Sequence, residues 1–449
     1  MIQMTLTKAA EILNAAPPSE DIEFHGISID TRKIEPGNLF IAIPGENYDG
    51  HQFISEAKNK GAVAAIVSTP HADLPQLLVQ DTTAALGQLG AYWRKQFNLP
   101  IIGITGSNGK TTLKNMIAAI MTVACNNNEN QVLATIGTLN NHWGLPLTLL
   151  RLNAQHKYAA IEMGMNHFGE IEYLTQLAKP HVAVITNAAA SHLEGVKNIA
   201  GVARAKAEIF SGLEKDGIAI LNRDDAFYTF WREVIDKRQY LTFGFHPDAD
   251  ISATVTQAQN MQIVAMQTPQ GTIEINLPLL GKHNVLNTLA AAAACLAINI
   301  ELDAIKTGLE NIRPAAGRLE MHTLANGVNI IDDTYNANPF SLQAAVSTLS
   351  TFIGKKIFVL GDMKELGSEE KFLHRIAGEQ IRSAGIDFLF TYGELSADTA
   401  TSFGEGAFHF NNQEKLVEAL KPFLYNQTTI LVKGSRSMRM EKVIRGLIE

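Results

Sequence analysis

The residues best suited to chemistry lie where an apolar run gives way to glycines. Residues 101–105, I-I-G-I-T, precede G-S-N-G-K-T-T at 106–112. The apolar run predicts a strand and Lys110 opens a predicted helix, so the glycines form a tight turn between the two. Backbone N–H groups of such a turn attract an anion, while Lys110 can reach the outer phosphates and the Thr111 hydroxyl can ligate Mg²⁺. We therefore predict a phosphate-binding loop made of Gly106, Ser107, Asn108, Gly109, Lys110, Thr111 and Thr112.

This loop departs from the common Walker pattern, which reads G-x-x-x-x-G-K-T. The pattern requires glycine where Ile104 stands, and Gly103 comes one position too early. The match is therefore to a shorter core, and a glycine-rich turn with a chance Lys-Thr pair is the simpler alternative. Support for a phosphate site has to come from residues elsewhere in the chain.

Three more reactive side chains follow the predicted strands at 158–162 and 182–187. Glu162 ends the first strand, His192 lies in the loop after the second, and Lys206 lies on the helix that comes next. Ligands of a parallel sheet bind beyond the carboxyl ends of its strands, where these groups would meet. A carboxylate beside a phosphate loop suits Mg²⁺. Taken singly, the three could be a helix-capping acid, a satisfied loop histidine and a solvated lysine, but their joint placement favours one site.

Further polar residues are candidates for binding. A donor-rich loop near the N-terminus could hold a sugar or nucleotide phosphate, although turn chemistry explains it equally well; it contains Ser28, Asp30, Thr31 and Arg32. Asn284 and Asn287 share one face of a predicted Ala-rich helix, where their amides can contact a purine or a phosphate. A packed core helix explains the alanines but not these amides. Arg318 and Asp333 would meet the nucleotide from the far side.

The elements that must position these residues alternate between strand and helix, which predicts an α/β protein. Residues 85–312 predict a doubly wound, mainly parallel sheet, and a smaller series of strand–helix units follows at 313–449. Pro314 and Gly317 break the helical pattern between them. Residues 1–84 mix short strands with helices. At about 150 residues per domain, the chain of 449 residues corresponds to three domains.

Composition and charge exclude several classes of protein. Hydrophobic residues make up 46% of the chain, enough for a core in each domain, and the net charge of −8 gives no reason to expect a nucleic-acid partner. The longest apolar run has 10 residues, whereas a membrane span needs about 20. The N-terminus lacks the apolar core of a signal peptide. Cys125 and Cys295 are too few and too far apart for a disulfide framework. We expect a cytoplasmic monomer with no membrane span.

Seven motifs resemble the Mur ligases in order and spacing across the whole chain. They are T-G-S-N-G-K-T-T, I-E-M-G-M-N-H-F-G-E-I, T-N-A-A-A-S-H-L-E, A-K-A-E-I-F, G-K-H-N-V-L-N, G-R-L-E and D-D-T-Y-N-A-N-P. The segments N-N-H-W-G-L-P-L-T-L-L and V-K-G-S-R-S-M-R-M-E are similar to the branch of this family that adds D-alanyl-D-alanine. The D-N-P-R motif that resembles diaminopimelate selection in MurE-type ligases is absent. The family is similar in using a shortened phosphate loop, which accounts for Ile104.

The resemblance implies a fold and an activity. It implies a small α/β UDP-sugar domain at 1–84, a central P-loop ATPase domain at 85–312, and a C-terminal Rossmann-like domain at 313–449 that closes over the site. It also implies an ATP-dependent amide ligase of peptidoglycan precursor synthesis. Such an enzyme joins D-alanyl-D-alanine to UDP-MurNAc-tripeptide through an acyl phosphate and releases UDP-MurNAc-pentapeptide, ADP and phosphate.

The same resemblance implies a role for each site residue. Lys110 and Thr111 would bind the phosphates and a first Mg²⁺, with Glu162 also serving the metals. His192 and a carbamylated Lys206 would hold a second Mg²⁺, so Lys110, Glu162, His192 and Lys206 are the predicted catalytic residues. Further nucleotide contacts would come from Asn284, Asn287, Arg318 and Asp333. Substrate contacts would come from Ser28, Asp30, Thr31, Arg32, Asn140, Asn141, Asn336 and Asn338.

Three other functions are alternatives. A MurE-like or folylpolyglutamate-synthetase-like amide ligase would share the central domain but lacks support in the N-terminal segments and at 332–339. A P-loop kinase would need an acceptor with a hydroxyl group. A nucleotide-gated switch would need no amine substrate. The sequence leaves open whether the third residue of the peptide is diaminopimelate or lysine.

Overall fold

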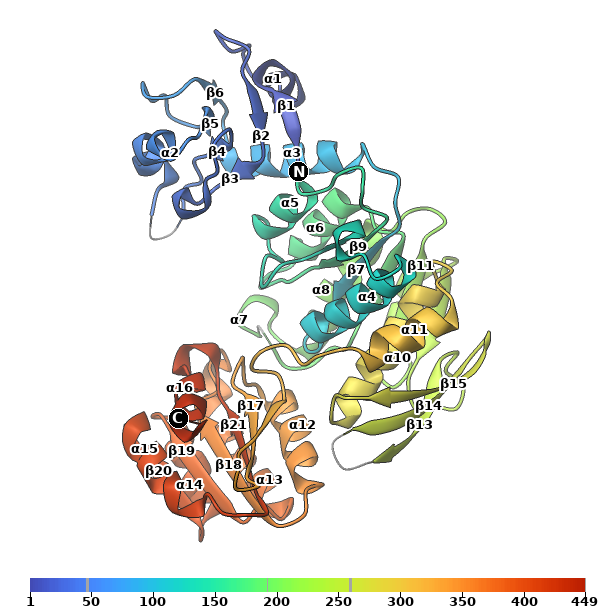
Figure 1. Ribbon diagram of the computed structural model, residues 1–449, viewed down its shortest axis with the longest axis vertical. Coiled ribbons are helices and arrows are strands. Elements are labelled where there is room, and N and C mark those ends of the chain that lie inside the picture. Colours follow the sequence, from blue (N-terminus) through green and yellow to red (C-terminus); the bar gives the residue numbers. More distant parts are fainter. Residues whose placement is uncertain (46–47, 192, 258–260, 449) are drawn as a thin grey trace.

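The computed structural model of the protein describes residues 1–45, 48–191, 193–257 and 261–448. The chain forms three consecutive parts, each built around a sheet of its own, which follow one another from top to bottom in Figure 1. This arrangement confirms the predicted fold class: a small α/β part, a central part with a parallel sheet and a Rossmann-like C-terminal part.

The first part contains a four-stranded parallel sheet and a separate two-stranded ribbon. The sheet has the order β3-β4-β5-β6, and the ribbon pairs β1 with β2 antiparallel. The strands are β1 (Gln3–Thr5), β2 (Glu23–His25), β3 (Ile27–Ser28), β4 (Leu39–Ile41), β5 (Ala64–Val67) and β6 (Gln76–Leu78). The helices of this part are α1 (Leu6–Leu13) and α2 (Ile54–Asn59).

Helix α3 (Thr82–Arg94) connects the first part to the central one. The Asp81 side chain accepts hydrogen bonds from the backbone N–H groups of Thr83 and Ala84 and so begins the helix. The helix packs against α1 on one side and against two central helices, α5 (Gly144–Leu149) and α6 (Glu170–Ala178), on the other. The predicted boundary at residue 84 lies within α3 and stays a prediction.

The central part is a six-stranded sheet in which every neighbouring pair is parallel, with the order β12-β11-β10-β7-β9-β8. Its strands are β7 (Ile101–Thr105), β8 (Val132–Ala134), β9 (Tyr158–Glu162), β10 (Val182–Ile185), β11 (Ile218–Asn222) and β12 (Gln239–Phe243). Its helices are α4 (Lys110–Ala124), α5 (Gly144–Leu149), α6 (Glu170–Ala178), α7 (Leu193–Val196), α8 (Ile199–Ala207), α9 (Tyr228–Ile235), α10 (Lys282–Leu296) and α11 (Leu302–Glu310).

Strand β7 is buried throughout because both faces of this sheet are covered. Ile102 and Ile104 belong to the core beneath α4 and α10, whereas Ile101 belongs to the core on the opposite face, with Leu145 of α5 and Leu174 of α6. Parallel strands buried on both faces read as continuous hydrophobic runs. The glycine loop therefore starts from a strand that packing holds on two sides.

A three-stranded antiparallel sheet lies beside the central sheet and was not predicted. It consists of β13 (Ser252–Gln257), β14 (Gln262–Thr268) and β15 (Gly271–Leu277). Gln262 is buried and its Nε2 donates to the Leu279 carbonyl at 2.7 Å. A buried glutamine obscures the alternation of apolar and polar residues by which such a strand is predicted.

The third part has the order β16-β17-β21-β18-β19-β20, in which β16 alone runs antiparallel to its neighbour. Its strands are β16 (Glu320–Thr323), β17 (Asn329–Asp333), β18 (Lys355–Gly361), β19 (Phe388–Tyr392), β20 (Ala407–Phe410) and β21 (Thr428–Lys433). Its helices are α12 (Pro339–Ser350), α13 (Glu370–Ser383), α14 (Ser396–Phe403), α15 (Gln413–Leu420) and α16 (Glu441–Ile448).

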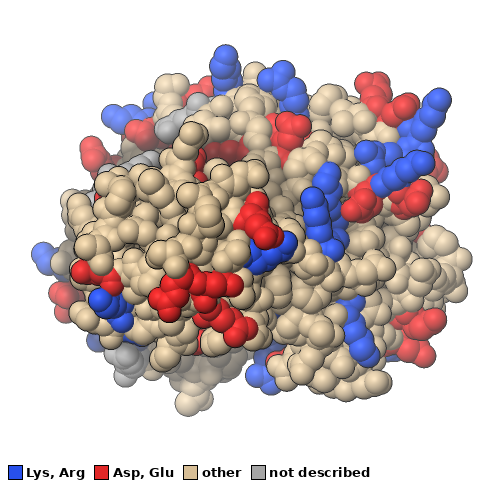
Figure 2. All heavy atoms as spheres, turned by 90° about the horizontal axis from the view of Figure 1, so that it is seen from above, with Lys and Arg blue, Asp and Glu red and all other residues tan. Residues whose placement is uncertain are grey.

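Surface charge and cysteine placement agree with the composition. The face in Figure 2 carries Lys and Arg side chains interspersed with Asp and Glu side chains. Cys125 and Cys295 are both buried and unpaired, so neither contributes a disulfide. No helix within the described residues is long and apolar enough to cross a membrane.

Arg94, at the end of α3, generates a prediction about stability. Its guanidinium is buried and donates to the carbonyls of Ala178, Lys179 and Phe97 at 2.9, 3.2 and 2.8 Å, so it satisfies the end of α6. We expect Arg94→Met to lower the free energy of unfolding by about 3 kcal/mol, because buried carbonyls lose a charged donor. Urea unfolding measures the change, with the exposed neighbour variant Lys95→Met expected within about 0.5 kcal/mol of wild type. Equal effects of both variants would contradict this assignment.

Candidate nucleotide-binding site

The glycine loop between β7 and α4 is held by the segment that follows β10. Ser107 N–H donates to the Asn187 carbonyl at 3.0 Å, and Asn108 N–H donates to Asn187 Oδ1 at 3.1 Å. The Thr186 hydroxyl donates to the Asn108 carbonyl at 2.6 Å. A Cβ on Gly106 would collide with the Thr186 side chain, so only glycine allows this approach. These contacts fix the loop at the N-terminus of α4, where an anion is favoured.

Two lysines lie beside this loop with little access to water. Lys110 Nζ donates to the Gly106 carbonyl at 2.6 Å, and burial lowers its pKa while Glu162 opposes that shift. Lys206 on α8 is only 2% exposed. Burial lowers the pKa of Lys206 well below its ordinary value, and the nearby Lys110 lowers it further. An anion bound here would compensate the charge of Lys110.

Glu162, at the end of β9, forms a set of hydrogen bonds opposite the loop. Its carboxylate accepts from the Thr111 hydroxyl at 3.0 Å and from Asn140 Nδ2 at 2.8 Å. Its backbone N–H donates to the Thr135 hydroxyl at 3.0 Å. Lys114 lies one turn further along α4 and donates to the Thr135 carbonyl at 2.9 Å. A buried carboxylate beside a hydroxyl is the kind of oxygen donor set that Mg²⁺ takes.

The N-terminus of α10 closes one side of the site. Asn287 lies against Gly109, where a Cβ would meet the Asn287 amide. Asn287 Nδ2 faces Asn284 Oδ1 at 3.4 Å, and Asn284 Nδ2 donates to the Leu280 carbonyl at 2.7 Å. Burial and the charge on Lys433 lower the pKa of the adjacent His283 to about 4, so its imidazole is neutral at physiological pH.

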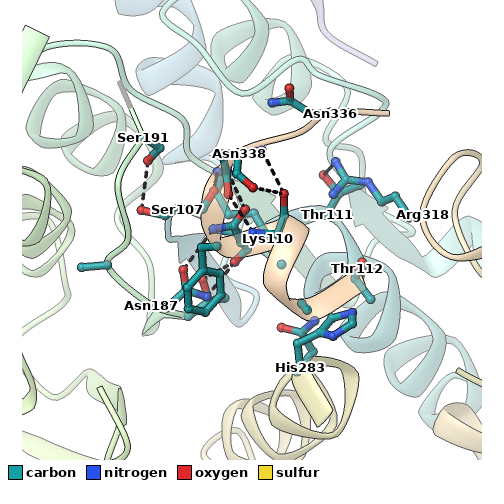
Figure 3. Close-up of a pocket in the computed structure, with 18 of the residues that line it drawn as sticks. Ser107, Lys110, Thr111, Thr112, Asn187, Ser191, His283, Arg318, Asn336 and Asn338 are labelled. Carbon is teal, nitrogen blue, oxygen red and sulfur yellow. Dashed lines mark hydrogen bonds between the residues drawn. The ribbon is translucent and has the colours of Figure 1, made fainter. Parts of the chain in front are cut away.

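The third part supplies the opposite wall. Arg318 Nη2 donates to the Thr111 hydroxyl at 3.3 Å, and its guanidinium stacks 4.0 Å from the Tyr335 ring centroid. The two side chains Arg318 and Thr111 lie next to each other in Figure 3. Lys433, at the end of β21, pairs with Asp333 at 2.6 Å and donates to the Asn336 carbonyl at 2.9 Å. Burial raises the pKa of Asp333, and the Lys433 ammonium opposes the shift.

Most of these groups border one cavity of about 680 Å³ between the central and third parts. Figure 3 shows residues from the loop, from α10 and from the third part around it. Of the residues predicted from the sequence, the cavity is lined by Ser107, Asn108, Gly109, Lys110, Thr111, Thr112, Asn140, Asn141, Glu162, Lys206, Asn284, Asn287, Arg318, Asp333, Asn336 and Asn338. Two of the three residues expected to meet at the carboxyl ends of the strands, Glu162 and Lys206, therefore line the same cavity.

Five other predicted residues that the structure describes are not among those that line the cavity: Gly106, Ser28, Asp30, Thr31 and Arg32. Gly106 is part of the loop, and its carbonyl accepts from Lys110. The N-terminal loop makes local turn contacts: Asp30 accepts from the Arg32 guanidinium at 2.9 and 2.8 Å, and Thr31 donates to Glu56 at 3.0 Å. The Ser28 hydroxyl, in the same loop, donates to the Asp30 carbonyl at 2.9 Å. His192 lies outside the described residues.

Sequence reasoning missed several residues of the site. Lys433, Tyr335 and His283 line the cavity but were assigned no role. The signal for Lys433 was present, because a polar segment directly follows the apolar run at 429–432. What was absent was the strand order, since β21 lies next to β17 only in the folded sheet.

The fold and the site together define an α/β protein that binds a phosphate-bearing nucleotide at a short glycine loop. Comparison with protein families gives three consecutive matches. The family models are "Mur ligase family, catalytic domain" for residues 23–94, "Mur ligase middle domain" for 104–295 and "Mur ligase, glutamate ligase domain" for 317–436. A curated relative from Escherichia coli strain K12, named UDP-N-acetylmuramoyl-tripeptide–D-alanyl-D-alanine ligase, is 44% identical over 100% of this chain and 99% of its own. The chain belongs to the Mur ligase family, as the sequence motifs indicated.

Solved structures agree with this relationship. A crystal structure of MurF from Acinetobacter baumannii has a TM-score of 0.93 and 34% identity, and it covers 100% of this chain and 99% of its own. A MurF ligase from Thermotoga maritima, solved in complex with ADP, has a TM-score of 0.84 and 26% identity over 94% of this chain and 97% of its own. Both share the three-part arrangement over nearly the whole chain.

The Lys433–Asp333 pair generates a second prediction. Removing one partner of a buried pair leaves a charge without compensation, whereas removing both does not. We expect Lys433→Met to lower the free energy of unfolding by about 3 kcal/mol, and the double variant Lys433→Met/Asp333→Asn to recover more than half of that loss. Urea unfolding provides the measurement.

The matched control is Lys355→Met, which breaks the half-exposed pair between Lys355 and Asp387 at 3.3 Å in the same part of the chain. Surface pairs contribute about 0–1 kcal/mol, so this variant should differ little from wild type. A Lys433→Met protein as stable as the control would refute the idea of a tightly coupled buried pair.

Proposed function

We propose that this protein is an ATP-dependent amide ligase that joins D-alanyl-D-alanine to UDP-MurNAc-tripeptide. The products are UDP-MurNAc-pentapeptide, ADP and phosphate, in peptidoglycan precursor synthesis. The observation that carries the proposal is the cavity in which the loop, Glu162 and the third part converge. Support also comes from the E. coli relative with this activity in its name and from the T. maritima MurF described with ADP.

The chemistry requires a carboxylate to become an electrophile. The terminal carboxylate of the tripeptide attacks the γ-phosphorus of ATP, ADP leaves, and an acyl phosphate forms. The amine of D-alanyl-D-alanine then attacks the acyl carbon, phosphate leaves, and the amine gives up a proton. Lys110 and Arg318 offset the repulsion between the carboxylate and the triphosphate. Walls from two parts of the chain exclude water, which would otherwise hydrolyse the acyl phosphate.

Mg²⁺ fits the oxygen atoms of this site. The Thr111 hydroxyl and the Glu162 carboxylate are 3.0 Å apart beside the loop, and they would hold one ion. His192 and a carbamylated Lys206 would hold a second. When bound, Mg²⁺ supplies charge neutralisation of the phosphate oxygens. Asn284, Asn287 and Asp333 complete the nucleotide contacts in this proposal.

The surroundings of Lys206 support the proposed carbamylation. Only a neutral amine adds to carbon dioxide, and the lowered pKa of Lys206 raises the fraction of that form at a given pH. The product is an anion, so a carbamate would replace repulsion between Lys206 and Lys110 by attraction. Its oxygens would also suit a hard cation.

The three parts would divide the substrates among them. We assign UDP-sugar binding to 1–84, through Ser28, Asp30, Thr31 and Arg32, and ATP binding to 85–312. Residues 313–449 would close over the site. The Asn140, Asn141 and Asn336 amides, which border the cavity, would contact the peptide substrates. Asn338 lies beside them, but its amide is already bonded to Ser341 and to Asn108. We further propose that the enzyme acts as a monomer in the cytoplasm, where ATP is supplied.

Phosphate release tests the reaction. With ATP, Mg²⁺ and UDP-MurNAc-tripeptide, we expect release only when D-alanyl-D-alanine is also present, because the amine must break down the acyl phosphate. Tripeptides with diaminopimelate and with lysine are assayed in parallel. Lys110→Ala should abolish turnover while UDP-MurNAc-tripeptide still binds by calorimetry. ATP turnover that is indifferent to the dipeptide would exclude the ligase, and phosphoryl transfer to a hydroxyl acceptor would favour a kinase.

Carbon dioxide dependence tests the carbamate. We expect turnover to fall several-fold in buffer stripped of carbon dioxide and to return when bicarbonate is added, because the carbamate decomposes and reforms. Lys206→Met should have low turnover that bicarbonate does not change. Wild-type turnover that is the same in both buffers would disprove the carbamate but leave the ligase reaction intact.

A further inference from the structure

Besides the bond from Arg318 to Thr111, a second hydrogen bond joins the glycine loop directly to the third part of the chain. Asn338 Nδ2 donates to Asn108 Oδ1 at 3.0 Å. Asn338 is the N-cap residue directly before α12, and Asn108 lies in the middle of the loop. The bond therefore connects two residues that are 230 positions apart and lie on opposite walls of the cavity. Figure 3 places Asn338 next to Lys110.

Helix α12 fixes the orientation of the Asn338 amide. Asn338 Oδ1 accepts from the Ser341 backbone N–H at 2.8 Å, and the Ser341 hydroxyl accepts from the Asn338 backbone N–H at 3.0 Å. This reciprocal pair is a capping box. Because Oδ1 is engaged with a backbone donor, Nδ2 is the atom that faces the loop. A donor there requires an acceptor, so Asn108 must present Oδ1 to it.

The Asn108 amide is then left with a donor that has no acceptor. Its backbone N–H and carbonyl are bonded to Thr186 and Asn187, and its Oδ1 is bonded to Asn338. Asn108 Nδ2 is shielded from solvent and has no hydrogen-bond partner within the described residues. Buried donors without an acceptor are rare and point to a missing partner.

We infer that Asn338 is a positioning residue that turns the Asn108 Nδ2 donor toward a polyphosphate oxygen of the nucleotide. This inference rests on the proposed function, because it requires a nucleotide at the loop. Lys110 Nζ donates to the Gly106 carbonyl. A bound phosphate would attract the Lys110 ammonium away from that carbonyl and place a phosphate oxygen beside the loop. Docking of the third part orients the donor, and the phosphate supplies its acceptor, so each event favours the other.

A purely structural role for Asn338 as a helix cap makes different predictions. Serine caps helices about as well as asparagine but cannot reach Asn108 with an amide donor. Asn338→Ser therefore keeps the cap and removes the bond to the loop. Asn412 provides a matched control, since it begins α15 in the same part and accepts from the Lys415 backbone N–H.

The test is a double-variant cycle read by binding and by turnover. Dissociation constants for ADP and for inorganic tripolyphosphate are measured by calorimetry for wild type, Asn108→Ala, Asn338→Ser, the double variant and Asn412→Ser. We expect Asn108→Ala to weaken both ligands roughly ten-fold, as for a lost hydrogen bond to a charged group. Asn338→Ser should raise both dissociation constants about three-fold, which is half of the Asn108→Ala effect on a logarithmic scale. The double variant should have the same dissociation constants as Asn108→Ala.

Several results would overturn the inference. If the double variant weakens binding by the product of the two single effects, Asn338 does not act through Asn108. ADP and tripolyphosphate binding unchanged in Asn338→Ser would show that it only caps α12, as would a loss of thermal stability without a loss of binding. Asn412→Ser should leave binding and turnover at wild-type values. ADP binding needs no peptide substrate. The binding cycle therefore tests this inference even if the wild-type protein fails in the ligase assay, and that failure would count against the proposed reaction alone.

Discussion

The site depends on the close approach of the glycine loop to the segment after β10. Ser107 and Asn108 bond to Asn187 through backbone groups and an amide, and the Thr186 hydroxyl bonds to the loop carbonyl. There is no room for a side chain on Gly106 at this contact. A loop held in this way presents its N–H groups before any ligand arrives, so binding does not have to bear the cost of ordering it.

A second consequence concerns charge. Lys110 and Lys206 are brought together in a place where water is scarce, and their pKa values fall as a result. Asp333 and Lys433 are also withdrawn from water, but they compensate each other at 2.6 Å. The charge of Lys433 is therefore compensated within the protein, whereas Lys110 lies at the loop, where a polyphosphate chain would compensate its charge.

Much of this organisation could be predicted from local sequence. The strand before the loop, the loop itself and Glu162 are defined by residues that are adjacent in the chain, where apolar runs and glycines are informative. Lys433 and the contact of Asn338 with the loop could not be predicted, because they arise from strand order and from packing between parts. The antiparallel sheet β13-β14-β15 was also missed: the buried Gln262 obscures the pattern of β14, although residues 273–277 of β15, I-E-I-N-L, do alternate.

Arg318 lies in the linker between the central and third parts. Arg318 is flanked by Gly317 and Leu319, both in the left-handed region, with φ values of +70° and +54°. A non-glycine residue in that region is strained, so this backbone shape is held by its surroundings. The guanidinium that reaches Thr111 is thus carried by a backbone whose shape is fixed on both sides of Arg318. Its distance from the phosphate loop therefore depends on how the third part packs against the central part.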